Sequence, residues 1–223
     1  MFHETVSKTW ETPEMVTRLS ATPPNERLMR FAAGERQKGT GNHLLDIGCG
    51  AGCNAIPLVR EGWHVLGIDL SEPMLAAAQQ RAKDNDLMNR LFLKKAPMIQ
   101  LPLEDNCADF LVAHGIWNLA RSTQEFRIAI REAARVAKPG APLFVYTFSR
   151  STLAPEASPA PGEAFVFSTS AGEPRCFLTI PQLLAKLSAA GFTPEQDWPI
   201  IEYPQRPGCP KPAILEGIFR FHL

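Results

Sequence analysis

An acidic residue followed by three glycines at alternate positions is the stretch of this chain best suited to bind a nucleotide-like cofactor. It reads Leu44-Leu45-Asp46-Ile47-Gly48-Cys49-Gly50-Ala51-Gly52, with an apolar run at its start and a predicted helix over 54–60 after it. Glycines at a strand-to-helix turn let the backbone approach a ligand, and free N–H groups at the helix start bind anionic or hydroxyl oxygens. A second predicted strand, 64–68, ends at Asp69, whose carboxylate can accept hydrogen bonds from two ribose hydroxyls. The pattern therefore indicates a site for a ribose-containing cofactor.

The spacing of the glycines separates two classes of cofactor. A dinucleotide site needs a glycine three residues after Gly50, and that position is Cys53. The third glycine is Gly52 instead, and the resulting D-x-G-x-G-x-G pattern, with Asp69 downstream, resembles that of class I S-adenosylmethionine-dependent methyltransferases. The resemblance implies methyl transfer from S-adenosylmethionine to a small-molecule acceptor. Two alternatives stay open: a non-catalytic S-adenosylmethionine-binding regulator and an NAD-dependent oxidoreductase on the same type of sheet.

Further stretches resemble the tellurite-resistance and ubiquinone-type branches of the small-molecule methyltransferases. They are Asn54-Ala55, Gly62-x-His64-Val65-x-Gly67-Ile68-Asp69, Leu101-Pro102-Leu103-Glu104-Asp105 and Ala134-Arg135-Val136-Ala137-Lys138-Pro139-Gly140. The resemblance covers about residues 41–148 well and the rest by the order of elements. It implies an α/β fold of the Rossmann-like kind, with a doubly wound, mostly parallel seven-stranded sheet and helices on both faces.

The resemblance also implies which residues contact the cofactor: Asp46, Gly48, Cys49, Gly50, Gly52, Asp69, Leu70, Met98 and His114. Two positions depart from the family pattern. Pro97 stands where the family usually has the acid that binds the adenine amino group, so adenine would rely on backbone groups and the apolar sides of Met98 and Leu70. Cys53 stands where the tellurite-resistance branch commonly has an arginine, which argues against tellurite as the acceptor.

Several side chains have both a functional and a structural interpretation. His114 follows the fourth predicted strand, where it could line the sulfonium pocket, act as a base near pH 7 or only pack. Trp117 and Asn118 come next and could bound the substrate, although core packing explains most tryptophans. Trp10 could close over the cofactor or only anchor its segment. Cys49 has no evident base beside it, so its backbone is expected to matter more than its sulfur.

The composition argues against several other classes of protein. Lysine plus arginine equals aspartate plus glutamate, at 23 each, so nothing indicates a nucleic-acid surface. Five cysteines without a CxxC spacing indicate reduced thiols in a cytosolic protein, and the histidines show no metal-ligand spacing. The start lacks the pattern of a signal peptide, and no apolar run approaches the roughly 20 residues that span a bilayer. We therefore expect a cytoplasmic enzyme for a small molecule, with no metal, nucleic acid or membrane.

The order of predicted elements indicates one methyltransferase domain over residues 1–223. We expect an N-terminal helical lid over 1–40, the cofactor-binding half over 41–148, and a substrate-side insertion with a C-terminal hairpin over 149–223. No catalytic residue is predicted, because a methyl donor with a strong leaving group needs alignment and exclusion of water rather than a triad. Tyr146, in the fifth predicted strand, is expected to pack, with contact to the substrate as the lesser alternative.

The local patterns also predict where individual elements begin and end. Strands and helices alternate from 44 to 148, which predicts a parallel sheet. Capping boxes at Ser122-x-x-Glu125 and Thr179-x-x-Gln182 predict two helix starts. A short strand is predicted at 164–168, and the final pair of strands at 192–200 and 213–221.

Overall fold

The computed structural model describes residues 8–39, 41–169, 172–205, 208 and 211–222. Its strands are β1 (His43–Ile47), β2 (His64–Asp69), β3 (Leu91–Lys95), β4 (Phe110–His114), β5 (Pro142–Phe148), β6 (Val166–Ser168), β7 (Pro174–Cys176), β8 (Phe192–Pro194), β9 (Ile201–Tyr203) and β10 (Ile214–Phe221). Its α-helices are α1 (Pro13–Ser20), α2 (Glu26–Lys38), α3 (Ala55–Arg60), α4 (Glu72–Lys83), α5 (Thr123–Val136) and α6 (Ile180–Ser188). Short 3-10 helices are η1 (Lys8–Glu11), η2 (Trp117–Leu119) and η3 (Arg150–Thr152).

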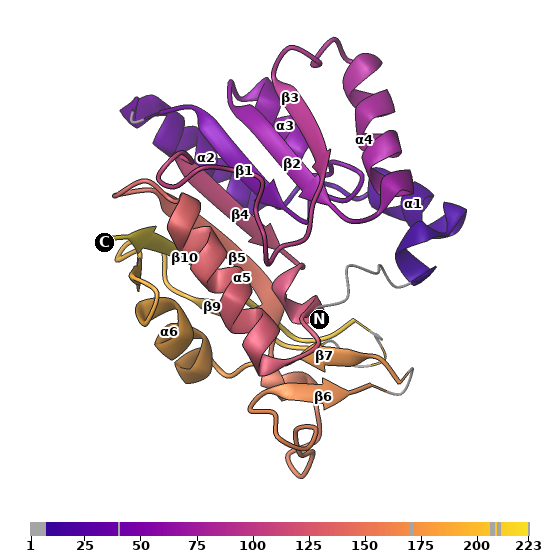
Figure 1. The fold of residues 1–223 in the computed structure, drawn as a ribbon, viewed down its shortest axis with the longest axis vertical. Helices are drawn as coiled ribbons and strands as arrows, with labels where there is room; N and C mark the ends of the chain where they lie inside the picture. The colour runs from indigo at the N-terminus through magenta and orange to yellow at the C-terminus, as the bar shows by residue number, and fades with distance from the viewer. Residues whose placement is uncertain (1–7, 40, 170–171, 206–207, 209–210, 223) are drawn as a thin grey trace.

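One large sheet organises the molecule, with the strand order β3-β2-β1-β4-β5-β10-β8 and with β9 also paired to β10 (Figure 1). Strands β1 to β5 pair in parallel, and β10 is antiparallel to β5. The strand order reverses between β1 and β4. The carboxyl ends of strands at such a reversal form the crevice where open α/β sheets bind ligands. The predicted doubly wound, mostly parallel fold is confirmed.

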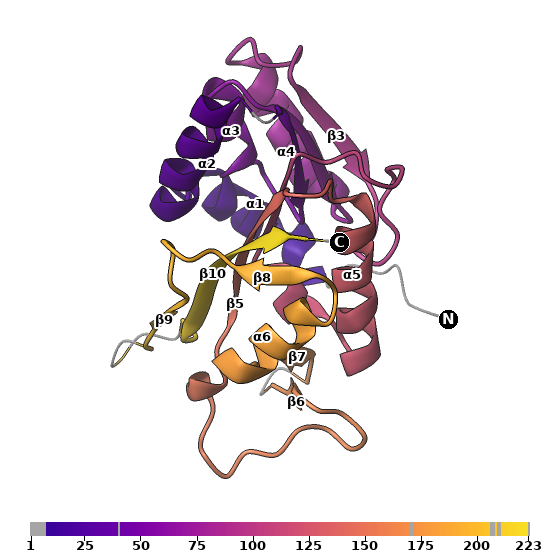
Figure 2. The same ribbon diagram turned by 90° about the vertical axis from the view of Figure 1, so that its left-hand side faces the viewer.

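Helices cover both faces of this sheet, as the view in Figure 2 shows for α2 and α3 on one side and α5 on the other. Leu44 and Val112 belong to the core packed against α2 and α3, whereas Leu45 and Leu111 belong to the core packed against α5 and α6. Neighbouring residues of a strand point to opposite faces, so a central strand needs apolar side chains on both. This explains the continuous apolar run of β4.

Polar side chains fix the starts of the helices that follow the strands. The Ser71 hydroxyl accepts a hydrogen bond from the Met74 N–H, and the Ser122 hydroxyl accepts one from the Glu125 N–H. Thr179 and Gln182 form the reciprocal capping box that the sequence predicts. No helix within the described ranges has both the length and the hydrophobicity that crossing a bilayer requires.

The C-terminal part differs in detail from the sequence prediction. The sequence predicts one strand over 192–200, but the structure has the short β8 at the start of this range, followed by a turn, and β9 begins beyond it at Ile201. Pro194 and Pro199 cannot donate to a strand ladder, and the Trp198 ring packs against Phe31 at 5.3 Å between centroids. The large sheet therefore has eight strands among the described residues rather than seven. The sequence also missed β7, which pairs with β6 in a separate two-stranded sheet.

Candidate cofactor and active site

The glycine loop forms a turn that only glycine adopts without strain. Gly48, Gly50 and Gly52 have φ values of 74°, 52° and 77°. The Gly48 and Cys49 N–H groups both donate to the Ile68 carbonyl, at 2.8 and 2.9 Å, which ties the loop to the end of β2. A Cβ on Gly48 would lie 2.7 Å from Ile116 in the loop after β4. The absence of side chains thus lets the loops that follow β1 and β4 touch.

Asp69 ends β2 and is held by backbone groups on both sides. Its Oδ2 accepts from the Gly50 N–H at 2.9 Å, and its Oδ1 accepts from the Ser71 N–H at 2.8 Å. Burial raises the pKa of this carboxyl above its usual value, while the N–H groups of Ser71, Gly50 and Leu70 oppose the rise. Each oxygen keeps a second lone pair, so the carboxylate can still receive hydroxyl donors. Leu70 is half-buried beside it.

Asp46 is the most strongly perturbed carboxyl of the loop. It is buried, and its Oδ2 has no hydrogen-bond partner. Burial, followed by the charge of Asp69, raises its pKa to about 7. A buried, unpaired acceptor is costly unless a ligand supplies a donor or a cation. This arrangement fits S-adenosylmethionine, which carries both an amino group and a sulfonium.

The thiols of the loop are not activated. Burial, then the neighbouring Asp46, raises the pKa of Cys49 well above that of a free thiol. A Cβ on Gly67 would lie 2.8 Å from the Cys49 sulfur, so Gly67 leaves the space in β2 into which this sulfur packs. Burial likewise raises the pKa of Cys53, to about 11. These thiols are packing groups rather than nucleophiles.

The N-terminal segment lies over the glycine loop and the start of α4. The Ser71 hydroxyl donates to the Trp10 carbonyl at 3.1 Å. The Leu19 side chain of α1 lies 4.0 Å from the place of a Cβ on Gly50. No residue of η1 or α1 is buried. Within the segment predicted as a lid, η1 and α1 therefore lie beside the glycine loop and the start of α4, whereas α2 packs into the core through Leu28, Phe31 and Ala32.

The residues predicted to flank adenine lie just beyond β3. The Ala96 N–H donates to the Asp69 carbonyl at 3.2 Å, which places Pro97 and Met98 next to the strand end that carries Asp69. Both side chains are half-buried, and Met98 packs against the core on the α5 side. The structure thus brings Asp46, the glycine loop, Asp69, Leu70, Pro97 and Met98 to one edge of the sheet.

The residues after β4 separate into two groups. His114 is half-buried and stacks on Tyr146, with ring centroids 4.2 Å apart and planes at 15°. Trp117 is fully buried and meets Phe126 edge-on at 6.0 Å. The Trp117 Nε1 and the Asn118 Oδ1 are buried without a hydrogen-bond partner. The structure therefore places Trp117 and Asn118 beneath the surface, and His114 at the edge of the crevice.

Sequence reasoning missed the neighbours of His114. Strand pairing places Tyr146 of β5 beside His114, and Glu216 of β10 beside Tyr146, which no local motif signals. Pairing of β1 with β4 also places Gly48 and His114 one step beyond the last paired residues, Ile47 and Ala113. His114 therefore lies at the same level as the start of the glycine loop.

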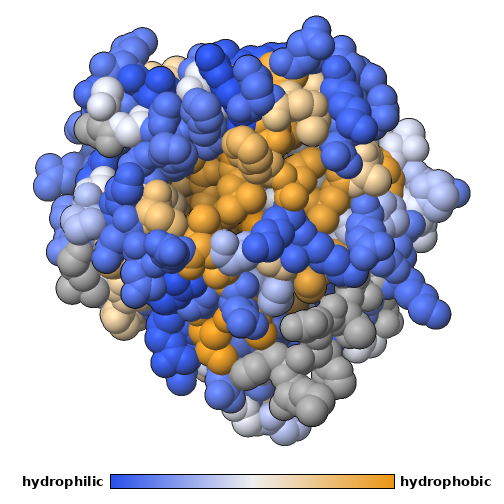
Figure 3. All heavy atoms as spheres, turned by 45° about the horizontal axis from the view of Figure 1, so that its top comes forward, coloured by the Kyte–Doolittle hydropathy of each residue, from blue (hydrophilic) through white to orange (hydrophobic). Residues whose placement is uncertain are grey.

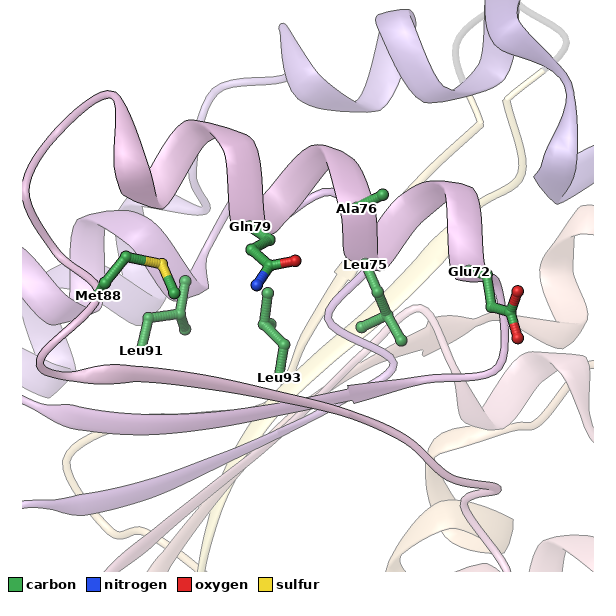
Figure 4. Close-up of a pocket in the computed structure, with 7 residues that line it drawn as sticks. All are labelled: Glu72, Leu75, Ala76, Gln79, Met88, Leu91 and Leu93. Carbon is green, nitrogen blue, oxygen red and sulfur yellow. The ribbon is translucent and has the colours of Figure 1, made fainter.

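Two cavities lie outside this constellation. A groove of about 270 Å³ runs between α4 and β3, where Leu75 and Gln79 of the helix face Met88, Leu91 and Leu93 (Figure 4). A cavity of about 720 Å³ lies past the end of β5 and is lined by η3, the start of α6 and Glu202. The surface view in Figure 3 shows a hollow where apolar side chains gather among polar ones. Neither cavity includes Asp46, Asp69, His114 or a loop glycine among its lining residues.

The chain resembles known methyltransferases in sequence. The profile of a family described as "Methyltransferase domain" matches residues 45–145. The 27-O-demethylrifamycin SV methyltransferase of Amycolatopsis mediterranei is 30% identical over 194 residues, which are 86% of this chain and 69% of that enzyme. A demethylmenaquinone methyltransferase of Lactiplantibacillus plantarum is 37% identical over 105 residues, 45% of this chain. The chain spans 43% of the length of that relative, and under half of several others that it matches.

Solved structures share the fold at lower sequence identity. The [4+2]-cyclase SpnF superposes with a TM-score of 0.72 at 22% identity, covering 99% of this chain and 97% of that one. The 1,6-didemethyltoxoflavin-N1-methyltransferase of Burkholderia thailandensis, solved with S-adenosylhomocysteine, gives a TM-score of 0.66 at 21% identity, covering 89% and 80%. Together with the sequence matches and the cofactor loop, these likenesses assign the chain to the class I S-adenosylmethionine-dependent methyltransferases.

Proposed function

We propose that this protein is an enzyme that transfers a methyl group from S-adenosylmethionine to a small-molecule acceptor. The observation that carries the proposal is the unpaired, buried oxygen of Asp46, which precedes a glycine loop that starts directly after the Ile47–Ile68 pair, at the level of Asp69. When bound, the cofactor supplies an electrophilic methyl group on a sulfonium sulfur. The protein's part is to orient the acceptor and exclude water. Relatives named for demethylmenaquinone and 27-O-demethylrifamycin SV support an acceptor of small size.

Each residue of the constellation has a role in the proposal. Asp69 holds the ribose hydroxyls, and Asp46 with Gly48, Cys49, Gly50 and Gly52 holds the methionine part. Leu70 and Met98 flank adenine, and His114 faces the methyl group. Trp10 closes over the site from the N-terminal segment. Trp117 and Asn118 are buried, so they meet an acceptor only if the loop after β4 moves.

The same proposal covers the organisation of the chain and its compartment. Residues 1–223 act as one domain, in which η1 and α1 of the segment 1–40 form a lid, 41–148 hold the cofactor and 149–223 contribute to the acceptor side. Four described cysteines, Cys49, Cys53, Cys107 and Cys176, are free thiols, which suits a reducing cytoplasm.

A labelled-methyl experiment tests the proposal. The protein is incubated with methyl-labelled S-adenosylmethionine and the small-molecule fraction of a bacterial lysate, and products are separated by mass spectrometry. A methyltransferase gives S-adenosylhomocysteine together with a labelled small molecule. An Asp69→Ala variant is the matched control and should give neither.

A regulator that binds the cofactor without transferring its methyl group is the second candidate. It is favoured by Pro97, which lacks the side-chain acceptor that the family usually offers to adenine. This candidate predicts binding of S-adenosylmethionine in calorimetry and no labelled product from any fraction. Labelled product that depends on Asp69 would exclude it.

A further inference from the structure

A row of three polar side chains crosses the sheet beside the cofactor loop. Strand pairing sets His114 of β4 opposite Tyr146 of β5, and Tyr146 opposite Glu216 of β10. Paired residues project from the same face of a sheet. On this face the neighbours two residues earlier in β4 and β5, Val112 and Phe144, belong to the core covered by α2 and α3. The row therefore begins next to Gly48 and leads away from the cofactor.

The outer member of the row is fully engaged by the protein. Glu216 is buried, and its carboxylate accepts hydrogen bonds from Asn25 Nδ2 at 2.6 Å, Arg27 Nη1 at 3.2 Å and the Tyr203 hydroxyl at 3.2 Å. The Arg27 guanidinium balances its charge. This end of the row is a fixed, neutralised support and has no free charge to offer a ligand.

The inner two members are not engaged in this way. Among the described residues, neither the Tyr146 hydroxyl nor the His114 imidazole makes a hydrogen bond to another side chain, and the two rings stack on each other. Both side chains are half-buried and stacked, and the Gly115 N–H donates to the Tyr146 carbonyl at 2.8 Å. Two rigid rings thus present polar atoms that the protein itself does not satisfy.

Both rings are uncharged at neutral pH. Burial lowers the pKa of His114 to about 4, so its imidazole is neutral and can donate or accept a hydrogen bond. Burial, then the charges of Glu216 and Tyr203, raise the pKa of Tyr146 above its ordinary value, so its phenol stays a donor. The two rings carry no positive charge that could pair with a carboxylate, which disfavours a carboxylate at the same place.

We propose that His114 and Tyr146 form the floor of the methyl-acceptor site, which takes an uncharged, flat, ring-bearing molecule with its reacting hydroxyl against the Tyr146 phenol. This inference rests on the proposed function. A hydroxyl both donates and accepts, which matches one phenol and one neutral imidazole, and two stacked rings supply the mostly apolar surface on which such ligands sit. In the transfer, the hydroxyl oxygen forms a bond to the methyl carbon while the carbon–sulfur bond breaks toward sulfur. The hydroxyl proton passes to water.

Calorimetry on the protein loaded with S-adenosylhomocysteine tests this assignment, with 1-naphthol, naphthalene and 1-naphthoate as probes. We expect 1-naphthol to bind roughly fivefold more tightly than naphthalene, the gain of one neutral hydrogen bond, and 1-naphthoate to bind no better than naphthalene. Tyr146→Phe keeps the ring and removes the hydroxyl, so it should abolish the preference for 1-naphthol while leaving the affinity for S-adenosylhomocysteine unchanged.

The matched control is Tyr203→Phe, which removes another hydroxyl near Glu216 but outside the row and on an exposed side chain. It should keep the preference for 1-naphthol. The assignment is overturned if wild type shows no such preference, if 1-naphthoate binds most tightly, or if Tyr146→Phe behaves like wild type. A protein that fails to bind S-adenosylhomocysteine overturns the proposed function, and this inference with it.

Discussion

The cofactor end and the acceptor end of this crevice differ in how they hold charge. At the cofactor end, Asp46 and Asp69 are carboxyls whose pKa values burial raises, and Asp46 has an unpaired oxygen. At the acceptor end, Glu216 is paired with Arg27, while His114 is neutral. Burial of these carboxyls destabilises the cofactor end when no ligand is bound, whereas the acceptor end carries no such cost. The difference indicates that binding the positively charged cofactor requires no further negative group, because Asp46 and Asp69 are already in place in the folded protein.

Replacing Asp69 should produce the largest effect, and this effect should be on the affinity for the cofactor alone. Asp69→Ala removes two charge-assisted hydrogen bonds to ribose, each of about 1.5–3 kcal/mol, so the dissociation constant for S-adenosylmethionine should rise by roughly 100-fold or more. Calorimetry measures it, and circular dichroism checks that the variant folds. Tyr146→Phe is the control from the acceptor end. Equal affinity of folded Asp69→Ala and wild type would show that this carboxylate does not bind ribose.

The cofactor end was accessible to sequence reasoning because its geometry is local. Gly48, Gly50 and Gly52 occupy positive φ angles within one turn, and Asp69 ends the next strand. The acceptor end was not accessible in the same way. Tyr146 becomes a neighbour of His114, and Glu216 a neighbour of Tyr146, only through the pairing of β4, β5 and β10. The end of β8 at Pro194 and the later start of β9 at Ile201 likewise depend on the packing of Trp198 against Phe31.

The unfavourable burial of the Asp46 carboxyl should make the stability of the protein depend on pH in the absence of cofactor. The unfolded chain ionises this carboxyl near its ordinary pKa of 3.8, whereas the folded protein keeps the proton until about pH 7. Between these values the folded state holds more protons, so stability falls as pH rises, by at most about 4 kcal/mol. Asp46→Asn should therefore raise the melting temperature at pH 8 and leave it nearly unchanged at pH 4.

Thermal melts of wild type and Asp46→Asn across this pH range give the measurement. Tyr146→Phe serves as the control, since its phenol does not titrate in this window. A constant difference between Asp46→Asn and wild type at all pH values would contradict a raised pKa for Asp46.

Alanine substitutions at two glycines near the boundary between the cofactor end and the acceptor end should lower the free energy of unfolding by different amounts. Gly48 and Gly115 both have positive φ, at 74° and 73°. A Cβ on Gly48 would lie 2.7 Å from Ile116, whereas a Cβ on Gly115 would have nothing within 4 Å. We expect Gly115→Ala to cost about 1–2 kcal/mol of unfolding free energy from backbone strain, and Gly48→Ala to cost about 1–3 kcal/mol more. Denaturant unfolding measures both, and similar losses would show that the loops do not touch.

The smallest effect is expected where the cofactor end departs from its family. Pro97→Asp introduces the carboxylate that the family usually offers to the adenine amino group. Binding of S-adenosylmethionine should tighten modestly or stay unchanged, and loss of the proline should lower stability by up to about 1 kcal/mol. Affinity and melting temperature are measured together. Several-fold weaker binding by a folded variant would show that Pro97 and Met98 do not lie over adenine.

The most direct test of the central claim is calorimetric titration of the unmodified protein with S-adenosylmethionine and, separately, with NAD. The D-x-G-x-G-x-G loop and the unpaired Asp46 oxygen predict a saturable heat with S-adenosylmethionine at one site per chain, and none with NAD. Saturable binding of NAD without any heat from S-adenosylmethionine would contradict the assignment of this crevice to a methyl donor.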